Sequence, residues 1–154
     1  MASQLLNKDF KEFAELLNAN AVEYLVVGGY ALVAHGHPRY TGDIDFWVHQ
    51  TPDNIDRLVT TLTEFGFSSL GLSAEDFLKP DAIVQMGYPP ARIDLMVSIS
   101  GVTFEHAYAG RITVTLDGVA LNFISREDFL HNKRTVGRFK DLSDAEALDP
   151  RPRD

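Results

Sequence analysis

Apolar and polar residues recur along this chain with two different periods. Near the N-terminus, apolar residues follow helical spacing and predict an amphipathic helix; they are Leu5, Leu6, Phe10, Phe13, Leu16 and Leu17. Alternating or continuous apolar stretches predict strands over residues 23–27, 41–48, 82–86, 92–98, 112–116 and 119–123. Capping residues, prolines and apolar spacing predict helices over residues 30–35, 52–65, 74–79, from 126 onwards and over 142–148.

Two carboxylates lie on one face of the strand predicted over residues 41–48. Side chains two positions apart on a strand project to the same side, so Asp43 and Asp45 share a face, about 6–7 Å apart along the strand. Such a pair repels itself unless a cation lies between the two charges. Mg²⁺ takes carboxylate oxygens together with phosphates and water, so the pair suggests a metal site. A solvated strand face or a turn would show the same short pattern.

The strand predicted over residues 23–27 ends in two glycines, Gly28 and Gly29, and a short helix follows. Glycines at a strand-to-helix junction let a ligand approach the backbone, and the first turn of a helix offers N–H groups to an anion. A tight turn without a ligand is the alternative. Together with the carboxylates, the turn points to chemistry on a nucleoside triphosphate.

A third acid, Asp94, lies in the strand predicted over residues 92–98. Because Ile93, Leu95 and Val97 alternate with it, Asp94 faces away from its apolar neighbours. An acid in an apolar strand needs a partner or solvent. Asp94 is therefore a candidate metal ligand, or the general base that takes a proton from an attacking hydroxyl. An ion pair with Arg92 would explain it equally well.

The stretch from Gly28 to Val48, GGYALVAHGHPRYTGDIDFWV, resembles the nucleotidyltransferase superfamily with the DNA polymerase β-like fold. More narrowly, it is similar to small bacterial stand-alone members, including minimal nucleotidyltransferases and relatives of abortive-infection toxins. The resemblance implies an α+β fold, with a mixed β-sheet flanked by helices. It implies a single domain over residues 1–148, and we expect residues 149–154 to form a disordered tail.

The resemblance also implies a catalytic and metal-binding role for the three acids Asp43, Asp45 and Asp94. They would hold Mg²⁺ or Mn²⁺ beside the triphosphate. In this interpretation Asp43 and Asp45 bind the metal, while Asp94 holds a second metal or accepts the proton.

Four further residues match the nucleotide-binding positions of the family. Gly28 and Gly29 would border the triphosphate. Arg39 and Thr41 belong to an Arg-x-Thr-x-Asp run that the family tends to carry. Arg39 would approach phosphate, because Arg offers bidentate donors to phosphate oxygens, and Thr41 would supply a hydroxyl.

A basic segment over residues 131–146, HNKRTVGRFKDLSDAE, stands out from an acidic chain. Two of its cations, Lys133 and Lys140, are candidates to border the nucleotide or the acceptor, where they would offset phosphate charge. The alternative is a solvated helix pair, with Arg138 or Lys140 bonded to nearby acids. Those acids are Asp141 and Asp144. Trp47 also has two interpretations, because it could stack on a base or pack under a helix.

Composition narrows the class of protein. The 154 residues are 45% hydrophobic and 23% charged, as in one globular domain. The sequence has no cysteine, which excludes disulfides and thiolate zinc sites, and shows no signal peptide or long apolar run. We therefore expect a cytoplasmic protein without membrane contact. The formal net charge of −8 argues against extensive binding to duplex DNA, but permits a nucleotide, an RNA end or a protein acceptor.

Three hypotheses for function follow. The first is a metal-dependent nucleotidyltransferase that moves a nucleotide from a nucleoside triphosphate to a hydroxyl on a protein, RNA or small-molecule acceptor. The second is a binding module of a toxin–antitoxin or defence system that acts mainly through a protein partner of toxin type. The third is a nucleotide-binding protein that has lost transfer activity, since fold does not guarantee function.

Overall fold

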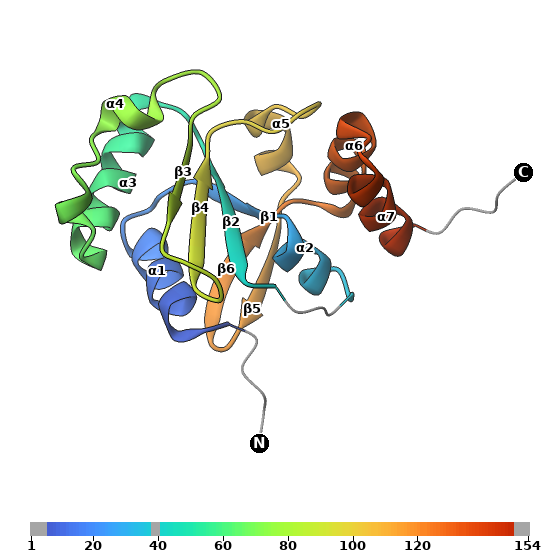
Figure 1. Ribbon diagram of the computed structural model, residues 1–154, viewed down its shortest axis with the longest axis horizontal. Helices are drawn as coiled ribbons and strands as arrows, with labels where there is room; N and C mark the ends of the chain where they lie inside the picture. The colour runs from blue at the N-terminus through green and yellow to red at the C-terminus, as the bar shows by residue number, and fades with distance from the viewer. Residues whose placement is uncertain (1–5, 38–40, 150–154) are drawn as a thin grey trace, which may run out of the picture.

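A computed structural model describes residues 6–37 and 41–149 of the chain, and it consists of a mixed β-sheet flanked by helices (Figure 1). The strands are β1 (Tyr24–Val27), β2 (Asp43–Val48), β3 (Ile83–Met86), β4 (Arg92–Met96), β5 (Ile112–Leu116) and β6 (Val119–Phe123). The helices are α1 (Lys8–Ala19), α2 (Gly29–Ala34), α3 (Pro52–Phe65), α4 (Ala74–Phe77), α5 (Phe104–Ala109), α6 (Arg126–Val136) and α7 (Phe139–Leu148), with a 3-10 helix η1 (Ser68–Leu70).

The strands are ordered β3-β4-β2-β1-β6-β5 within the described residues. The pairs β2–β4 and β1–β6 are parallel, while β1–β2, β3–β4 and β5–β6 are antiparallel. The sheet is therefore mixed, as expected from the sequence. This order places β2 and β4 side by side, although about 45 residues separate them along the chain.

The two faces of β2 pack against different helices. Phe46 contacts Phe13 of α1, with ring centroids 5.5 Å apart, and Phe13 contacts Phe65 of α3. On the opposite face, Trp47 lies edge-on to Phe104 of α5 at 5.2 Å. The sheet is thus enclosed by α1 and α3 on one side and by α5 on the other (Figure 1). Trp47 is only 1% exposed, so its predicted packing role is confirmed.

Local sequence signals explain several helix ends. Thr51 caps α3 by accepting a hydrogen bond from the Asn54 N–H, Pro52 occupies the first turn, and Gly66 ends the helix in a left-handed conformation. Ser125 caps α6 in the same way through the Asp128 N–H. These caps fix where the helices begin relative to the preceding strands.

Helices α2 and α4 differ from the prediction by one or two residues at their ends, and α1, α7 and α5 differ in ways that have a physical reason. Helix α1 begins at Lys8, because Asn7 caps it, so Leu6 precedes the helix, and Leu5 lies outside the described residues. Helix α7 begins at Phe139 rather than at residue 142. The prediction missed its first turn because Phe139 is 92% exposed, so it does not belong to the buried apolar positions that mark the helix. Helix α5 was not predicted, because its six residues are too few to show a helical period.

The buried Asn54 ties α3 to the start of β1 and the end of β2. Its side chain accepts a hydrogen bond from the Glu23 N–H at 2.7 Å, and donates to the Glu23 carbonyl at 3.0 Å and the His49 carbonyl at 2.9 Å. Asn54 has no exposed surface. Its amide therefore pairs with the Glu23 N–H and adds a second hydrogen bond to the Glu23 and His49 carbonyls, which also accept from the His49 and Thr51 N–H groups. Among the described helices, none combines the length and the apolar character that crossing a membrane requires.

Candidate active site

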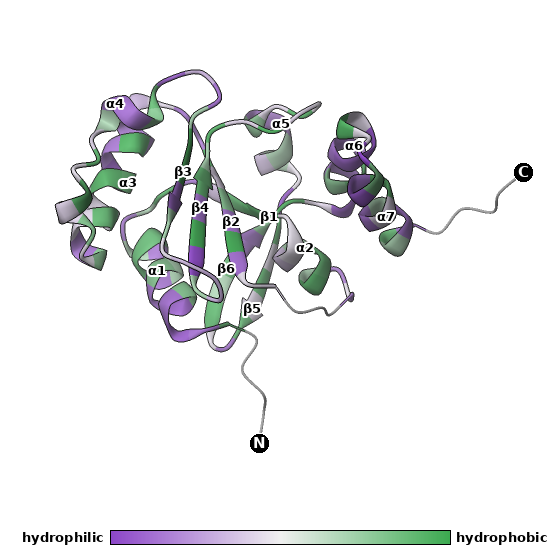
Figure 2. Ribbon diagram, in the orientation of Figure 1, coloured by the Kyte–Doolittle hydropathy of each residue, from purple (hydrophilic) through white to green (hydrophobic). Residues whose placement is uncertain are grey.

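The pairing of β2 with β4 brings the three predicted acids together. In the parallel register, Asp45 lies opposite Asp94, and Asp43 lies opposite Arg92. One carboxylate oxygen from each of Asp43, Asp45 and Asp94 lies within 4.8 Å of the other two. Figure 2 shows this cluster as a hydrophilic stretch at the beginning of two strands that are otherwise largely hydrophobic.

Gly28 brings the backbone at the end of β1 against this cluster. Val27, the residue before it, pairs with Asp45 across the sheet. Gly28 has a positive φ of 71° and forms the N-cap of α2, so Gly29 is the first residue of that helix. A Cβ atom at Gly28 would overlap Oδ2 of Asp45. Only glycine combines this backbone conformation with such a close approach to the acid.

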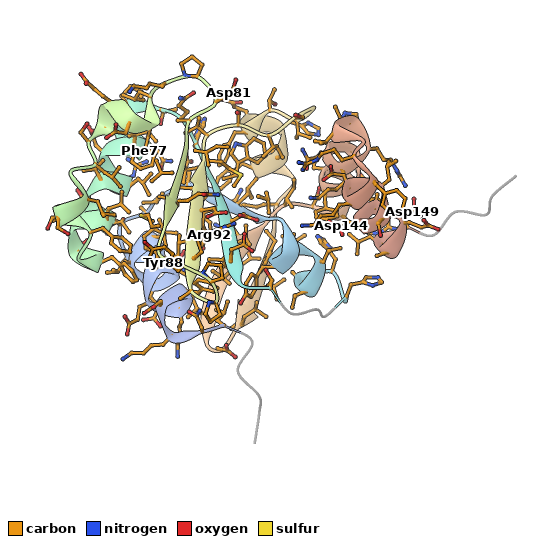
Figure 3. All side chains as sticks on the ribbon, viewed as in Figure 1. Phe77, Asp81, Tyr88, Arg92, Asp144 and Asp149 are labelled. Carbon is orange, nitrogen blue, oxygen red and sulfur yellow. The ribbon has the colours of Figure 1, made fainter. Side chains whose placement is uncertain are left out.

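Arg92 joins two of the three acids. Its Nε donates to Asp94 Oδ1 at 3.0 Å, and its Nη2 donates to Asp94 Oδ2 at 3.1 Å and to Asp43 Oδ2 at 2.8 Å. The guanidinium therefore forms a fork on Asp94 and a bridge to Asp43, at the middle of the sheet (Figure 3). These bonds, first those with Asp94, raise the pKa of Arg92 above its usual value.

Thr41 fixes the remaining side of Asp43. Its hydroxyl lies 2.9 Å from the Asp43 carbonyl and 3.2 Å from Asp43 Oδ1. Asp43 thus has Thr41 on one carboxylate oxygen and Arg92 on the other. Thr41, predicted to supply a hydroxyl to the site, contacts a member of the acid cluster. Arg39, the other residue of that run, lies outside the described residues.

Asp45 differs electrostatically from the other two acids. Burial raises the pKa of Asp45 to about 7, and the charge of Asp43 and a hydrogen bond shared with Asp94 act in the same direction. The charge of Lys133 on α6 acts in the opposite direction. Asp45 receives no hydrogen bond from Arg92 among the described contacts, so a bound cation would stabilise its ionised form.

The basic segment is partly neutralised by its own acids. Lys133 lies 3.4 Å from Asp141 and 3.7 Å from Asp144, both buried on α7, and Arg138 donates to Asp141 at 2.7 Å. Lys133 holds α6 against α7 and is also close enough to influence Asp45. Lys140 is exposed on α7. The ion pair between Arg138 and Asp141, and those of Lys133 with Asp141 and Asp144, agree with the alternative considered for this segment.

The acid cluster fits a hard divalent cation. All three donors are carboxylate oxygens, which suit Mg²⁺ and Mn²⁺ rather than softer metals. Asp94 is 5% exposed, and Asp43 and Asp45 are partly exposed, so the cluster opens to solvent on one side. Residues predicted from sequence thus come together as a possible metal site.

Sequence reasoning missed the bridge from Arg92 to Asp43. It considered Arg92 only as a partner for Asp94, two residues away on the same strand. The second bond depends on the register between β2 and β4, which no local pattern encodes. It also missed the effect of Lys133 on Asp45, which depends on how α6 lies relative to the sheet.

Comparisons with known proteins support the fold. The chain is similar to a structure from Thermotoga maritima described as a "putative nucleotidyltransferase", at 12% identity and a TM-score of 0.59, over 96% of this chain and 94% of that chain. It is also similar to an antigenic nucleotidyltransferase-like protein from Paracoccidioides brasiliensis, at 22% identity and a TM-score of 0.52, over 96% of this chain and 78% of that one. At these identities the similarity establishes the fold. A search of curated proteins found no significant match.

A family model gives the assignment. Residues 4–149 match the family described as "Nucleotidyltransferase of unknown function (DUF6036)". The matched region contains the glycine turn, all three acids and the α6–α7 pair. The resemblance noted from the sequence is thereby confirmed at the level of fold and family. The chain belongs to this family of nucleotidyltransferases.

Proposed function

We propose that this protein is a metal-dependent nucleotidyltransferase. It would move a nucleoside monophosphate from a nucleoside triphosphate to a hydroxyl on a protein, RNA or small-molecule acceptor. The observation that carries the proposal is the convergence of Asp43, Asp45 and Asp94 beside Gly28. The family and the fold support nucleotidyl transfer in general.

The proposed reaction is a displacement at the α-phosphate. The acceptor oxygen forms a bond to the α-phosphorus while the bond from that phosphorus to the bridging oxygen breaks. Pyrophosphate leaves with the electron pair, and the acceptor proton passes to a carboxylate of the site. A divalent cation held by Asp43 and Asp45 would neutralise negative charge that develops on the phosphate oxygens.

Each side chain of the cluster has a distinct task in this proposal. Asp43, oriented by Thr41 and Arg92, and Asp45, placed against Gly28, provide the metal-binding oxygens. Asp94 accepts the acceptor's proton, since each carboxylate oxygen can take more than one hydrogen bond. The turn at Gly28 and Gly29 borders the triphosphate, where a side chain at Gly28 would intrude.

The cationic residues would orient the nucleotide. Lys133, Lys140 and Arg39 are proposed to border the triphosphate or the acceptor. The electrostatic effect of Lys133 on Asp45 supports its place near the site. Its two ion pairs with α7 would hold the ammonium in position while it faces an anionic ligand.

The test is a transfer assay with each of ATP, CTP, GTP and UTP, labelled on the α-phosphate. The reaction contains Mg²⁺ or Mn²⁺ and a cell lysate as the source of acceptors. The matched control is the double variant Asp43→Asn/Asp45→Asn. Label that reaches protein, RNA or a small molecule only with the intact acids would support the proposal and identify the nucleotide and the acceptor class. Absence of transfer with all four nucleotides would contradict it.

A second candidate function is contact with a protein partner, as in a toxin–antitoxin or defence pair. It is favoured by apolar side chains exposed around the junction of α6 and α7. Phe139 is 92% exposed, Leu142 48% and Val136 36%. Three exposed apolar side chains near one helix junction would suit contact with a protein partner. The partner could also be the acceptor of the nucleotide.

A further inference from the structure

Arg92 lies in the middle of the acid cluster rather than at its edge. It is two residues before Asp94 on β4, so both side chains project from the same face. Across the sheet it pairs with Asp43. Its guanidinium contacts both carboxylate oxygens of Asp94 and one of Asp43, at 2.8–3.1 Å. The cation is thus placed by the strand register and not by a flexible loop.

This arrangement divides the cluster into two parts. The space between Asp43 and Asp94 contains a guanidinium, which stays protonated under all conditions in which the protein is folded. A metal ion held jointly by Asp43 and Asp94 would have to displace it. Asp45 has no bond from Arg92 among its described contacts; its carboxylate faces Gly28 and shares a hydrogen bond with Asp94. The position for a metal is therefore on the Asp45 side.

Charge balance leads to the same result. When ionised, three carboxylates and one guanidinium carry a net charge of minus two. One divalent cation balances this charge, whereas two would leave the cluster positive before any phosphate binds. The pair with Asp94 is the more shielded of the two, because the side chain of Asp94 is 7% exposed, whereas those of Arg92 and Asp43 are each 31% exposed.

Two-metal sites for phosphoryl transfer hold two divalent cations between their carboxylates. We propose that the guanidinium of Arg92 takes the place of one of these cations, so that each chain binds a single divalent cation through Asp43 and Asp45. This inference rests on the proposed metal-binding function. It makes Arg92 a positioning residue, since the guanidinium holds Asp43 toward the metal and keeps Asp94 from binding a second one. Asp94 is then left to act on the proton of the acceptor.

The test counts bound Mn²⁺ in nucleotide-free protein by electron paramagnetic resonance of the free ion. We expect one Mn²⁺ per chain in the unaltered protein and in Arg92→Lys, which keeps the charge. We expect two in Arg92→Gln, which opens the space between Asp43 and Asp94. Circular dichroism checks that Arg92→Gln is folded. Two Mn²⁺ ions bound to the unaltered protein, or only one bound to folded Arg92→Gln, would overturn the inference.

The control is Arg57→Gln on α3, which removes the same charge on the opposite side of the sheet. Arg57 donates to the Ala21 carbonyl and to Asn54, away from the acid cluster. We expect one Mn²⁺ for this variant. The experiment also separates the two proposals. Binding of no Mn²⁺ by the unaltered protein would contradict the metal-dependent function itself, whereas binding of two would contradict only the role of Arg92.

Discussion

Gly28 lies so close to Asp45 that a single methyl group on Gly28 would overlap the carboxylate. We predict that Gly28→Ala displaces Asp45 and weakens Mn²⁺ binding by roughly 10-fold or more, as loss of a group that positions a ligand does. The backbone of Gly28, with φ of 71° and ψ of −147°, is a conformation that is almost restricted to glycine, so alanine there adds a backbone cost of about 1–3 kcal/mol to folding. Mn²⁺ titration and urea unfolding measure the two effects separately.

Gly71→Ala is the matched control for this variant. Gly71 shares the positive φ, at +67°, but its ψ of 22° places it in the left-handed helical region, whereas Gly28 has a ψ of −147°. A methyl group added at Gly71 would meet no other atom within 4 Å, so Gly71→Ala should lose about 1–2 kcal/mol of stability and keep Mn²⁺ affinity. Equal affinity in the two variants would show that the contact between Gly28 and Asp45 does not matter for the site.

Asp45→Asn should stabilise the metal-free protein at alkaline pH. Because the pKa of Asp45 is raised to about 7, its favourable contribution to folding is present below pH 4 and is lost as the pH rises through 7. Asparagine removes this loss, so the gain in free energy of unfolding at pH 8 should be on the order of 2–4 kcal/mol. At pH 5 the gain should be much smaller. Urea unfolding in chelator measures both values.

Asp56→Asn on α3 serves as the comparison, because Asp56 is exposed and remote from the cluster. Its effect should stay within about 0.5 kcal/mol at either pH. If Asp45→Asn is less stable than the unaltered protein at pH 8, the prediction is wrong, because burial and the neighbouring charges then do not destabilise ionised Asp45.

Asp141→Asn should destabilise the protein at neutral pH and lose its effect in acid. The hydrogen bond from Arg138, and then the charge of Lys133, hold the pKa of Asp141 below its usual value, although burial opposes them. Its contribution is therefore present above pH 4 and is lost as the pH falls through the lowered pKa. We expect a cost of about 2 kcal/mol at pH 7. Denaturant unfolding between pH 7 and pH 2.5 tests this, and a difference that persists at the lowest pH would contradict it.

Asn54→Ala should reduce stability without changing the metal site. The variant leaves the Glu23 N–H without its partner and removes one of two hydrogen bonds from each of the Glu23 and His49 carbonyls, at a cost of about 2 kcal/mol. Asn132→Ala removes one exposed bond to the Ser100 carbonyl and should cost less than about 1 kcal/mol. Urea unfolding compares the two, and Mn²⁺ stoichiometry should be equal in both. Equal stability of the two variants would argue against the structural role of Asn54.

Phe139→Ser tests the second candidate function. The side chain is almost fully exposed, so its loss should change stability by less than about 0.5 kcal/mol. Cross-linking in the native cell should recover a partner with the unaltered protein and not with Phe139→Ser. Tyr88→Ser removes an 86% exposed aromatic between β3 and β4 and should keep the partner. Recovery with both variants would exclude the α6–α7 surface as the contact.

The parts of the fold that are encoded locally were predictable. Alternation in β2 and β4 correctly placed Asp43, Asp45 and Asp94 on strand faces away from Phe46 and Leu95. The strands predicted over residues 112–116 and 119–123 match β5 and β6 to the residue, and the Asp117-Gly118 turn between them has a positive φ at both positions, as a two-residue hairpin turn requires. Caps at Thr51 and Ser125 likewise depend only on nearby residues.

The remainder depends on contacts between distant segments. Arg92 reaches Asp43 across 49 positions of the chain, and only the parallel register of β2 and β4 makes the bond possible. Lys133 is neutralised by Asp141 and Asp144 because α6 and α7 fold against each other. Helix α5 is held by the contact of Phe104 with Trp47, and its own six residues carry little helical signal.

The position of Arg92 and Asp94 on one strand has a consequence for quality control in the cell. Shifting β4 by one residue would turn both charges into the core and bring Ile93 and Leu95, now nearly unexposed, to the surface. A chain with that error would lose the acid cluster, and it would also display the apolar surface that chaperones and proteases recognise. Assembly of the acid cluster and clearance of misfolded copies therefore depend on the same pairing, so few folded molecules that lack the cluster should accumulate.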